Sequence, residues 1–112
     1  MDQRAQKIAK LNDMFRASMG AYGYGKVFQT HGINSLPQSD QSRIRELVET
    51  YTDFNEDCDP HGEHDFGSLS HNGHKVFWKI DYYDTAYEYG SDKPEDATVT
   101  RRVLTILLAD EY

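Results

Sequence analysis

The sequence predicts an α+β domain in which an antiparallel sheet of about four strands carries two helices packed on one face. Two segments have apolar residues at the three- and four-residue spacing of amphipathic helices, and an Asn-Gly pair marks a tight hairpin between two strand-like runs. A late apolar run rich in β-branched residues adds another strand. With 112 residues the chain has room for a single domain, which we place at 1–112.

The first helix is expected from Asp2 to Ser18, because apolar residues there line one side of a helix. The members of this stripe are Ala5, Ile8, Leu11 and Phe15. The glycine-rich stretch 20–25 should end the helix, since glycine disfavours a continued helix and permits tight turns. A strand is expected next, from Lys26 to Thr30 or His31.

The second helix is expected after Pro37. Ser39 and Asp40 are its candidate N-caps, because short polar side chains accept hydrogen bonds from the free N–H groups of a first helical turn. Its apolar stripe consists of Ile44, Leu47, Val48 and Tyr51. The helix should end near Thr52.

The hairpin is predicted at Asn72-Gly73, because both residues tolerate the positive φ angles of a type I′ turn. The turn sets the register of the two strands. The expected cross-strand pairs are His71 with His74, Leu69 with Val76, Gly67 with Trp78, and Asp65 with Ile80. On the other face of the same strands, His64 and Asp81 are predicted to be neighbours.

The last strand is expected from Thr98 to Leu108. Both of its faces become apolar toward the end, which is typical of a strand in the middle of a sheet. A polar loop, 84–97, connects it to the hairpin.

The charge balance of the chain limits its partners. Lys and Arg total 12 against 19 Asp and Glu, which gives a formal net charge of -7. Direct nucleic-acid binding is therefore not expected, whereas a basic surface of another protein is a suitable partner. Cys58 is the single cysteine and no apolar run is long enough to span a membrane, so we expect a cytoplasmic protein without membrane contact. The oligomeric state stays open between a monomer and a homodimer.

A turn at 57–67 concentrates side chains that bind metals or transfer protons. His61, His64 and Asp65 are candidate ligands for zinc or manganese, although no cofactor is the simpler expectation. In a catalytic interpretation His64 is a general base oriented by Asp81, with Glu63 as the acid. In the structural interpretation, which we favour, Asp59 and Pro60 organise a tight turn.

An acidic and aromatic segment follows the hairpin. Its carboxylates could imitate the phosphates of a nucleic acid for a basic groove, and its tyrosines could supply rigid contact area. The candidate partner-binding residues are Asp81, Tyr83, Asp84, Tyr87, Glu88, Tyr89 and Asp92. Arg101 and Arg102 are expected to pair with these acids across the sheet. The alternative is a solvated loop with some buried tyrosines.

Several blocks of the sequence are similar to those of a bacterial family known only as a domain of unknown function. They are Asp53-Phe54, the block Asp59-Pro60-His61-Gly62-Glu63-His64-Asp65-Phe66-Gly67, the strand Phe77 to Asp84, Gly90-Ser91, and the C-terminal block Arg101 to Tyr112. The resemblance extends from Leu11 to Tyr112. It implies a small protein of plasmids and other mobile genetic elements, and it implies no activity. Cys58 stands where the resemblance implies Asn, which argues against an essential thiol.

Three functional hypotheses follow, the third of which is a structural or oligomer-forming module. The first is a small acidic protein-interaction module, an inhibitor or decoy that acts on a nucleic-acid-handling or host-defence protein in the manner of an anti-CRISPR protein. The second is a metal-dependent hydrolase that uses His61, Glu63, His64 and Asp65. We favour a binding protein over an enzyme, because the mobile-element setting that the resemblance implies suits an inhibitor or decoy.

Overall fold

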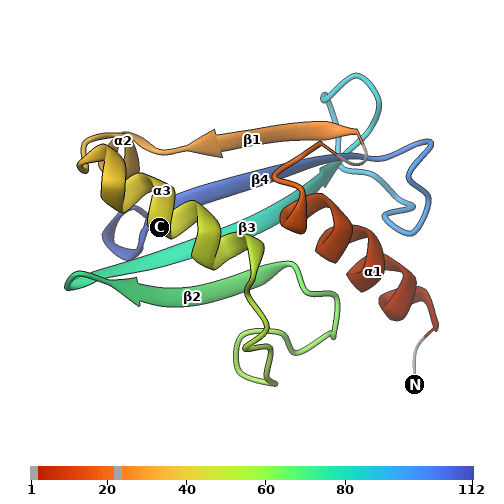
Figure 1. Ribbon diagram of the computed structural model, residues 1–112. Helices are drawn as coiled ribbons and strands as arrows, with labels where there is room; N and C mark the ends of the chain where they lie inside the picture. The colour runs from red at the N-terminus through yellow and green to blue at the C-terminus, as the bar shows by residue number, and fades with distance from the viewer. Residues whose placement is uncertain (1–2, 22–23) are drawn as a thin grey trace.

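A computed structural model describes residues 3–21 and 24–112. In chain order the elements are α1 (Gln3–Ala17), β1 (Gly25–Gln29), α2 (His31–Asn34), α3 (Gln38–Glu49), β2 (Phe66–His71), β3 (His74–Tyr83), β4 (Arg101–Leu108) and the short 3-10 helix η1 (Ala109–Glu111). The predicted start of the first helix at Asp2, and Tyr22 and Gly23 of the glycine-rich stretch, lie outside the described residues. The four strands form one sheet in the order β1-β4-β3-β2 (Figure 1).

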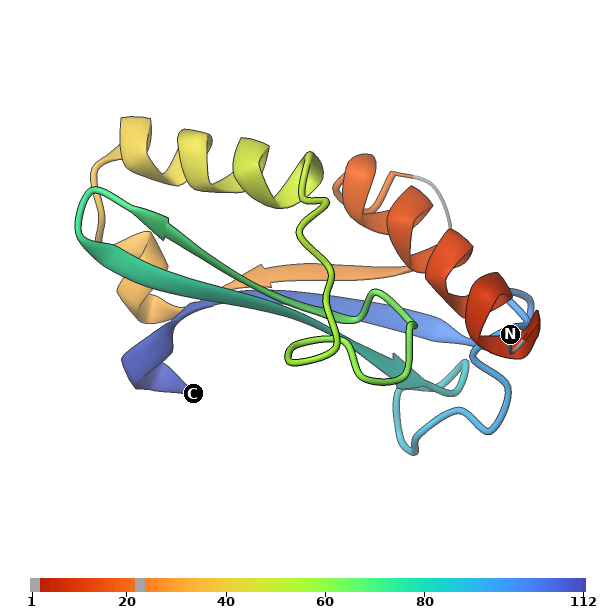
Figure 2. The same cartoon turned by 90° about the horizontal axis from the view of Figure 1, so that it is seen from below.

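The domain is α+β, as the sequence predicts, with α1 and α3 on the same side of the sheet (Figure 2). Side chains from both helices join those of the central strands in one apolar core. The core includes Phe15, Ile44 and Val48 from the helices, and Val76, Trp78, Ile80, Leu104 and Ile106 from the strands. None of the helices in the described ranges is long and apolar enough to cross a membrane.

The hairpin has the predicted register. Asn72 and Gly73 adopt positive φ angles of 48° and 79°, as a type I′ turn requires. The pairs His71 with His74, Leu69 with Val76, and Gly67 with Trp78 are all present. The Ile80 N–H donates to the carbonyl of Asp65 at 2.8 Å, which continues the ladder just beyond β2.

The predicted central strand is also present, since β4 lies between β1 and β3. It begins at Arg101 and not at Thr98, because the Asp96 carboxylate accepts hydrogen bonds from the backbone and hydroxyl of Thr98 and holds that residue in a turn. The sheet is mixed: β1 runs parallel to β4, whereas the other two pairings are antiparallel.

The helices differ from the prediction at both ends of α3, which ends at Glu49 and not near Thr52, and in the presence of one further helix. Pro37, and neither Ser39 nor Asp40, occupies the N-cap of α3. The Asp40 carboxylate instead accepts hydrogen bonds from His71 Nε2 and Asn72 Nδ2, both at 2.8 Å, and so ties the helix to the hairpin. The bond from His71 holds the pKa of Asp40 below its usual value. The one-turn helix α2 was not expected from the sequence.

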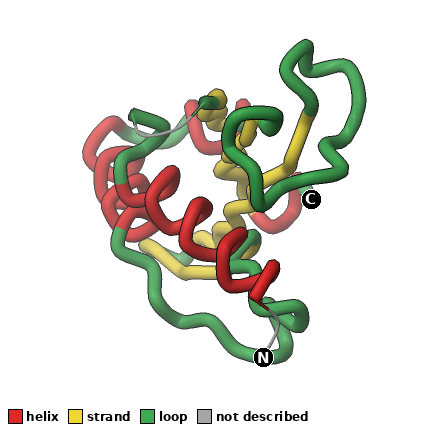
Figure 3. The backbone as a smooth tube through the Cα atoms, turned by 90° about the vertical axis from the view of Figure 1, so that its right-hand side faces the viewer, coloured by secondary structure: helices red, strands yellow, loops and turns green. Residues whose placement is uncertain are grey.

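Two loops rich in acidic residues lie at the same end of the sheet, where β2 and β4 begin and β3 ends. One is the segment 53–65 before β2, and the other is the segment 84–97 between β3 and β4. Figure 3 looks toward this end and shows loops, in green, around the strand ends. The fold thus brings together two acidic stretches that are well separated in the sequence.

Candidate functional site

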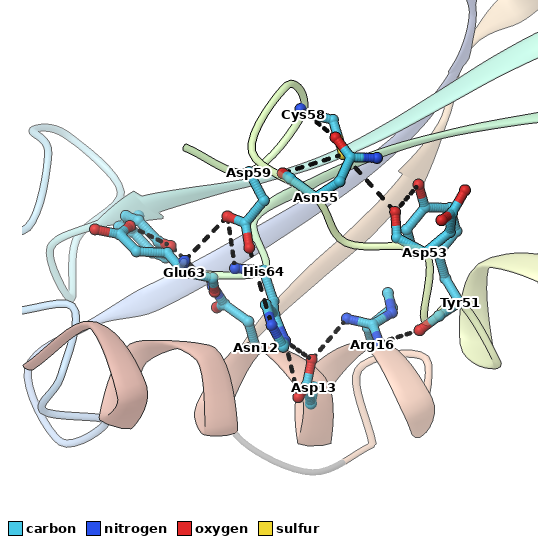
Figure 4. Close-up of polar contacts among 11 residues, drawn as sticks. Asn12, Asp13, Arg16, Tyr51, Asp53, Asn55, Cys58, Asp59, Glu63 and His64 are labelled. Atoms are coloured by element: carbon cyan, nitrogen blue, oxygen red, sulfur yellow. Dashed lines mark hydrogen bonds and ion pairs between the residues drawn. The ribbon is translucent and has the colours of Figure 1, made fainter. Parts of the chain in front are cut away.

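The segment 53–65 is built around the carboxylate of Asp59. Its Oδ1 accepts the backbone N–H groups of Glu63 and His64 at 3.0 and 3.1 Å (Figure 4). Gly62 takes a positive φ of 68° inside the turn. The Asp59 side chain is 3% exposed. Asp59 therefore has the backbone-binding role in a tight turn that the structural interpretation gives it.

His64 connects this turn to α1. Its Nδ1 lies 2.9 and 3.1 Å from the two carboxylate oxygens of Asp13, and its Nε2 lies 3.9 Å from Oδ2 of Asp59 (Figure 4). The imidazole stacks on the Phe54 ring, with 3.8 Å between the centroids. The side chain remains 30% exposed. His64 is thus held between two carboxylates at the surface.

The predicted contact between His64 and Asp81 is wrong. His64 has a positive φ of 56°, which turns the chain out of the strand before β2 begins at Phe66 and directs the imidazole to α1. Asp81 lies in β3 and pairs with Lys79, whose Nζ is 2.5 Å from Oδ2. Asp81 therefore does not orient the imidazole.

The other proposed catalytic and metal-binding residues do not converge. Glu63 Oε1 accepts the hydroxyl of Tyr82 at 3.1 Å, and His61 is exposed. Within 3–21 and 24–112, no group of three or more His, Cys, Asp or Glu side chains is arranged to hold a metal ion. The metal-dependent hydrolase stays a prediction, and the geometry of the described residues adds no support to it.

Asp65, in the same segment, is expected to make the stability of the protein depend on pH. Burial raises its pKa, and the nearby charge of Glu63 adds to the effect. The pKa of Asp65 is higher in the folded than in the unfolded chain, so the ionised carboxylate lowers the free energy of unfolding at neutral pH. This destabilisation disappears as the pH falls through the pKa of the folded state toward the pKa of the unfolded state. We expect Asp65→Asn to be more stable than the wild type at about pH 7 and the difference to shrink toward about pH 4. Urea unfolding at several pH values measures this, and a difference independent of pH would contradict it.

A buried arginine on α1 supports the same region. Arg16 Nε donates to the carbonyl of Val48 at 2.9 Å, and Nη2 donates to the carbonyl of Tyr51 at 3.0 Å. Its Nη1 contacts Asp13 at 3.1 Å, so Asp13 bridges Arg16 and His64 (Figure 4). The guanidinium also lies 4.9 Å from the Trp78 ring centre. Arg16 thereby fixes the end of α3 against α1.

A second buried residue of α1 links the two acidic loops. Asn12 is fully buried, and its Nδ2 donates to the carbonyl of Glu63 and to the hydroxyl of Tyr82 at 2.9 and 2.8 Å. Its Oδ1 accepts Arg102 Nε at 2.6 Å, and Arg102 Nη2 donates to the carbonyl of Pro94, also at 2.6 Å. Through Asn12 and Arg102, the segments 53–65 and 84–97 share one hydrogen-bond network.

Sequence reasoning missed Asn12, Asp13 and Arg16. A signal for two of them was present, since Asn12 and Arg16 follow the core residue Ile8 at steps of four and so lie on the buried side of α1. A polar residue on such a stripe must find partners inside the protein. Asp13 carries no comparable signal, because its partner His64 is 51 positions away.

The acidic and aromatic segment has both fixed and exposed residues. Oδ1 of Asp84 accepts the backbone N–H groups of Ala86 and Glu88 at 3.1 and 3.0 Å, so this carboxylate shapes the loop. Tyr83 and Tyr87 pack together, with ring centroids 6.4 Å apart. The exposed candidates for partner binding are Glu88, Tyr89 and Asp92, and Tyr89 has 73% of its surface accessible.

The expected pairing of Arg101 and Arg102 with these acids is wrong. The Arg101 guanidinium lies over the Tyr24 ring, 4.7 Å from its centre, whereas Arg102 is buried and binds Asn12 and the carbonyl of Pro94. The two residues are successive in β4, so their side chains leave on opposite faces of the sheet. Arg4 contacts an acid of this loop instead, with its Nε 3.2 Å from Glu95 Oε1.

The fold and these contacts define a small α+β protein with two acidic loops held together at one end of its sheet. A family model described as a protein of unknown function, DUF3768, matches residues 29–111. The chain belongs to this family. The match begins at the last residue of β1, so α1 with Asn12 and Arg16 lies outside the matched range. Searches of curated proteins and of solved structures gave no significant match.

Proposed function

We propose that this protein is a small acidic interaction module that binds a basic surface of another protein through the end of the sheet formed by segments 53–65 and 84–97. The observation that carries this proposal is the network of Asn12 and Arg102, which joins the two loops in the folded protein. A surface that is held in place before binding loses less conformational entropy when the partner arrives.

The charge of the two loops supports a basic partner. Of the 19 acidic residues in the chain, segment 53–65 contains six and segment 84–97 contains five, whereas Lys93 is the one lysine or arginine within them. The acids are Asp53, Glu56, Asp57, Asp59, Glu63 and Asp65 in the first loop, and Asp84, Glu88, Asp92, Glu95 and Asp96 in the second. Concentrated charge of one sign speeds the encounter with a surface of the opposite sign and selects against acidic partners.

The loops also provide an aromatic contact. Tyr89 projects from the second loop with most of its surface exposed, beside the exposed carboxylates of Glu88 and Asp92. Tyrosine contributes a large and rigid contact area and is enriched among the residues that dominate interface energetics. Exposed acids around a tyrosine suit a groove that normally receives the phosphates and bases of a nucleic acid. An inhibitor or decoy of a nucleic-acid-handling protein of host defence, of the anti-CRISPR kind, fits this chemistry and the mobile-element setting that the family resemblance implies.

Charge reversal on the second loop tests the proposal. Glu88→Lys with Asp92→Lys should abolish binding, since both side chains are exposed and their substitution leaves the loop-shaping carboxylate of Asp84 in place. The matched control is Glu46→Lys with Asp110→Lys, which changes the net charge equally at exposed positions on α3 and η1. Tagged proteins are incubated with nuclease-treated lysate of the source cells at about 0.1 M and about 1 M salt, and captured proteins are identified by mass spectrometry.

We expect the wild type and the control to retain one basic protein in stoichiometric amount at low salt, and the reversal variant to lose it. High salt should release it from the wild type and from the control, because screening weakens attraction between exposed charges. A partner retained equally by the reversal variant would contradict the proposal, as would the absence of any stoichiometric partner. Circular dichroism of each variant verifies that the fold is intact.

A further inference from the structure

A cavity of about 190 Å³ lies between α1 and the chain segments that precede β1 and β4. Its wall is largely apolar, with Leu11, Met14 and Phe15 from α1 and Tyr24 from the segment before β1. Met14 and Tyr24 are 46% and 59% exposed, which is unusual for large apolar side chains that line a cavity. Exposed apolar side chains around a hollow are typical of a surface that binds a ligand.

One charged side chain, Arg102, also lines this cavity. Arg102 is only 3% exposed, and its guanidinium binds neutral groups through two of its nitrogens: Nε binds the Asn12 side chain, and Nη2 binds the carbonyl of Pro94. Among the described residues no carboxylate lies within ion-pair distance of it, and Nη1 makes no hydrogen bond to them. The cation is therefore buried without a direct ion pair, although the charge of Glu63 acts on it from a longer distance.

A buried guanidinium without a direct ion pair is energetically unfavourable. Arginine does not escape the cost by losing its proton, because the guanidinium stays protonated in proteins even where burial lowers its pKa, as it does here. The charge of Glu63 and contact with the Tyr82 ring, 5.2 Å from the guanidinium carbon, offset part of the cost. A carboxylate placed against Nη1 would add the direct ion pair that is missing. A singly charged ligand adds less repulsion with Glu63 than a doubly charged phosphate does.

We propose that this cavity binds a small monocarboxylate with an apolar body, whose carboxylate accepts hydrogen bonds from Arg102 Nη1 and whose apolar part packs against Leu11, Met14 and Phe15. The volume sets the size of the ligand. An engineered apolar cavity of about 150 Å³ holds benzene, so a molecule of the size of benzoate or hexanoate fits here. This inference does not depend on the proposed binding of a basic protein.

The test is an NMR titration of the ¹⁵N-labelled protein with benzoate and with hexanoate. Both acids should cause saturable shifts of the Ala97 and Thr100 amides and of the Arg102 Nε–H signal. Their uncharged amides, benzamide and hexanamide, should bind at least about tenfold more weakly, because hydrogen bonds to a charged group are the stronger ones. Lack of saturable shifts with either acid would overturn the proposal. Equal affinity of an acid and its amide would also overturn it, since Arg102 would then not select the anion.

A cavity-filling variant locates the binding. Ala97 lines the cavity, so Ala97→Leu should weaken the binding of both acids severalfold or more. Ala86→Leu is the matched control, because it makes the same change at an exposed position of the same loop that does not line the cavity and should leave the affinity unchanged. If Ala97→Leu binds the acids as the wild type does, they bind elsewhere and the proposal is wrong. Should this variant not fold, the comparison of acids with amides on the wild type still decides.

Discussion

Replacement of Asn12 by alanine should lower the free energy of unfolding by about 3 to 5 kcal/mol. The side chain is fully buried and satisfies the Arg102 guanidinium, the Tyr82 hydroxyl and the Glu63 carbonyl at once. Its loss removes a hydrogen bond from a buried cation and one from each of two further polar groups. Hydrogen bonds to charged groups contribute about 1.5 to 3 kcal/mol, and the two neutral ones add to this. Urea unfolding at neutral pH measures the change.

Gln6→Ala is the control for this substitution. Gln6 lies exposed on the same helix and is also replaced by alanine, so we expect the free energy of unfolding to change by no more than about 0.5 kcal/mol. If Asn12→Ala costs less than about 1 kcal/mol, water replaces the side chain and the two loops are not held by this network. The proposed binding surface would then lose its main structural support.

Replacement of Trp78 by alanine is expected to cost about 3 to 5 kcal/mol, because it empties the centre of the core. Trp78 is fully buried and forms edge contacts with Tyr51 and Phe54, whose ring centres lie 5.3 and 6.0 Å from that of Trp78. Its cross-strand neighbour Gly67 has no side chain, and a Cβ there would lie 2.3 Å from Trp78 Nε1, so the glycine makes room for the indole.

Trp78→Phe separates the size of the side chain from its polarity. The Nε1–H of Trp78 has no hydrogen-bond partner among the described residues, and a buried donor without a partner is unfavourable. Phenylalanine removes this donor and keeps a ring, so we expect a loss of about 1 to 2 kcal/mol. Thermal and urea unfolding of both variants provide the comparison. Equal losses for phenylalanine and alanine would contradict the expectation that a retained ring preserves most of the contribution of Trp78.

The features that were predicted correctly are specified by short stretches of sequence. Asn72-Gly73 encodes its own turn geometry, and the register of β2 and β3 follows from it. The apolar character of both faces of the last strand predicted its central position. In both cases the information lies within about ten residues, where backbone preference and side-chain pattern agree.

The features that were not predicted depend on distant partners. The parallel pairing of β1 with β4 joins residues more than 70 positions apart, such as Val27 and Leu104. No local sequence pattern indicates this pairing. The positive φ of His64 overrides the alternation that would have placed it opposite Asp81. Composition identified the acidic segment after the hairpin and the turn at 57–67, but their common end of the sheet follows only from the strand order.

The position of β4 between β1 and β3 also determines when the domain can fold during synthesis. β1 forms its sheet hydrogen bonds with β4, so the first strand has no strand partner until residues 101–108 have left the ribosome. The hydrogen bond between Asn12 and Arg102 likewise cannot form until Arg102 has been synthesised. The N-terminal helix and strand must therefore remain unassembled while most of the chain is made, a period in which unpaired apolar segments are exposed to aggregation and to chaperones.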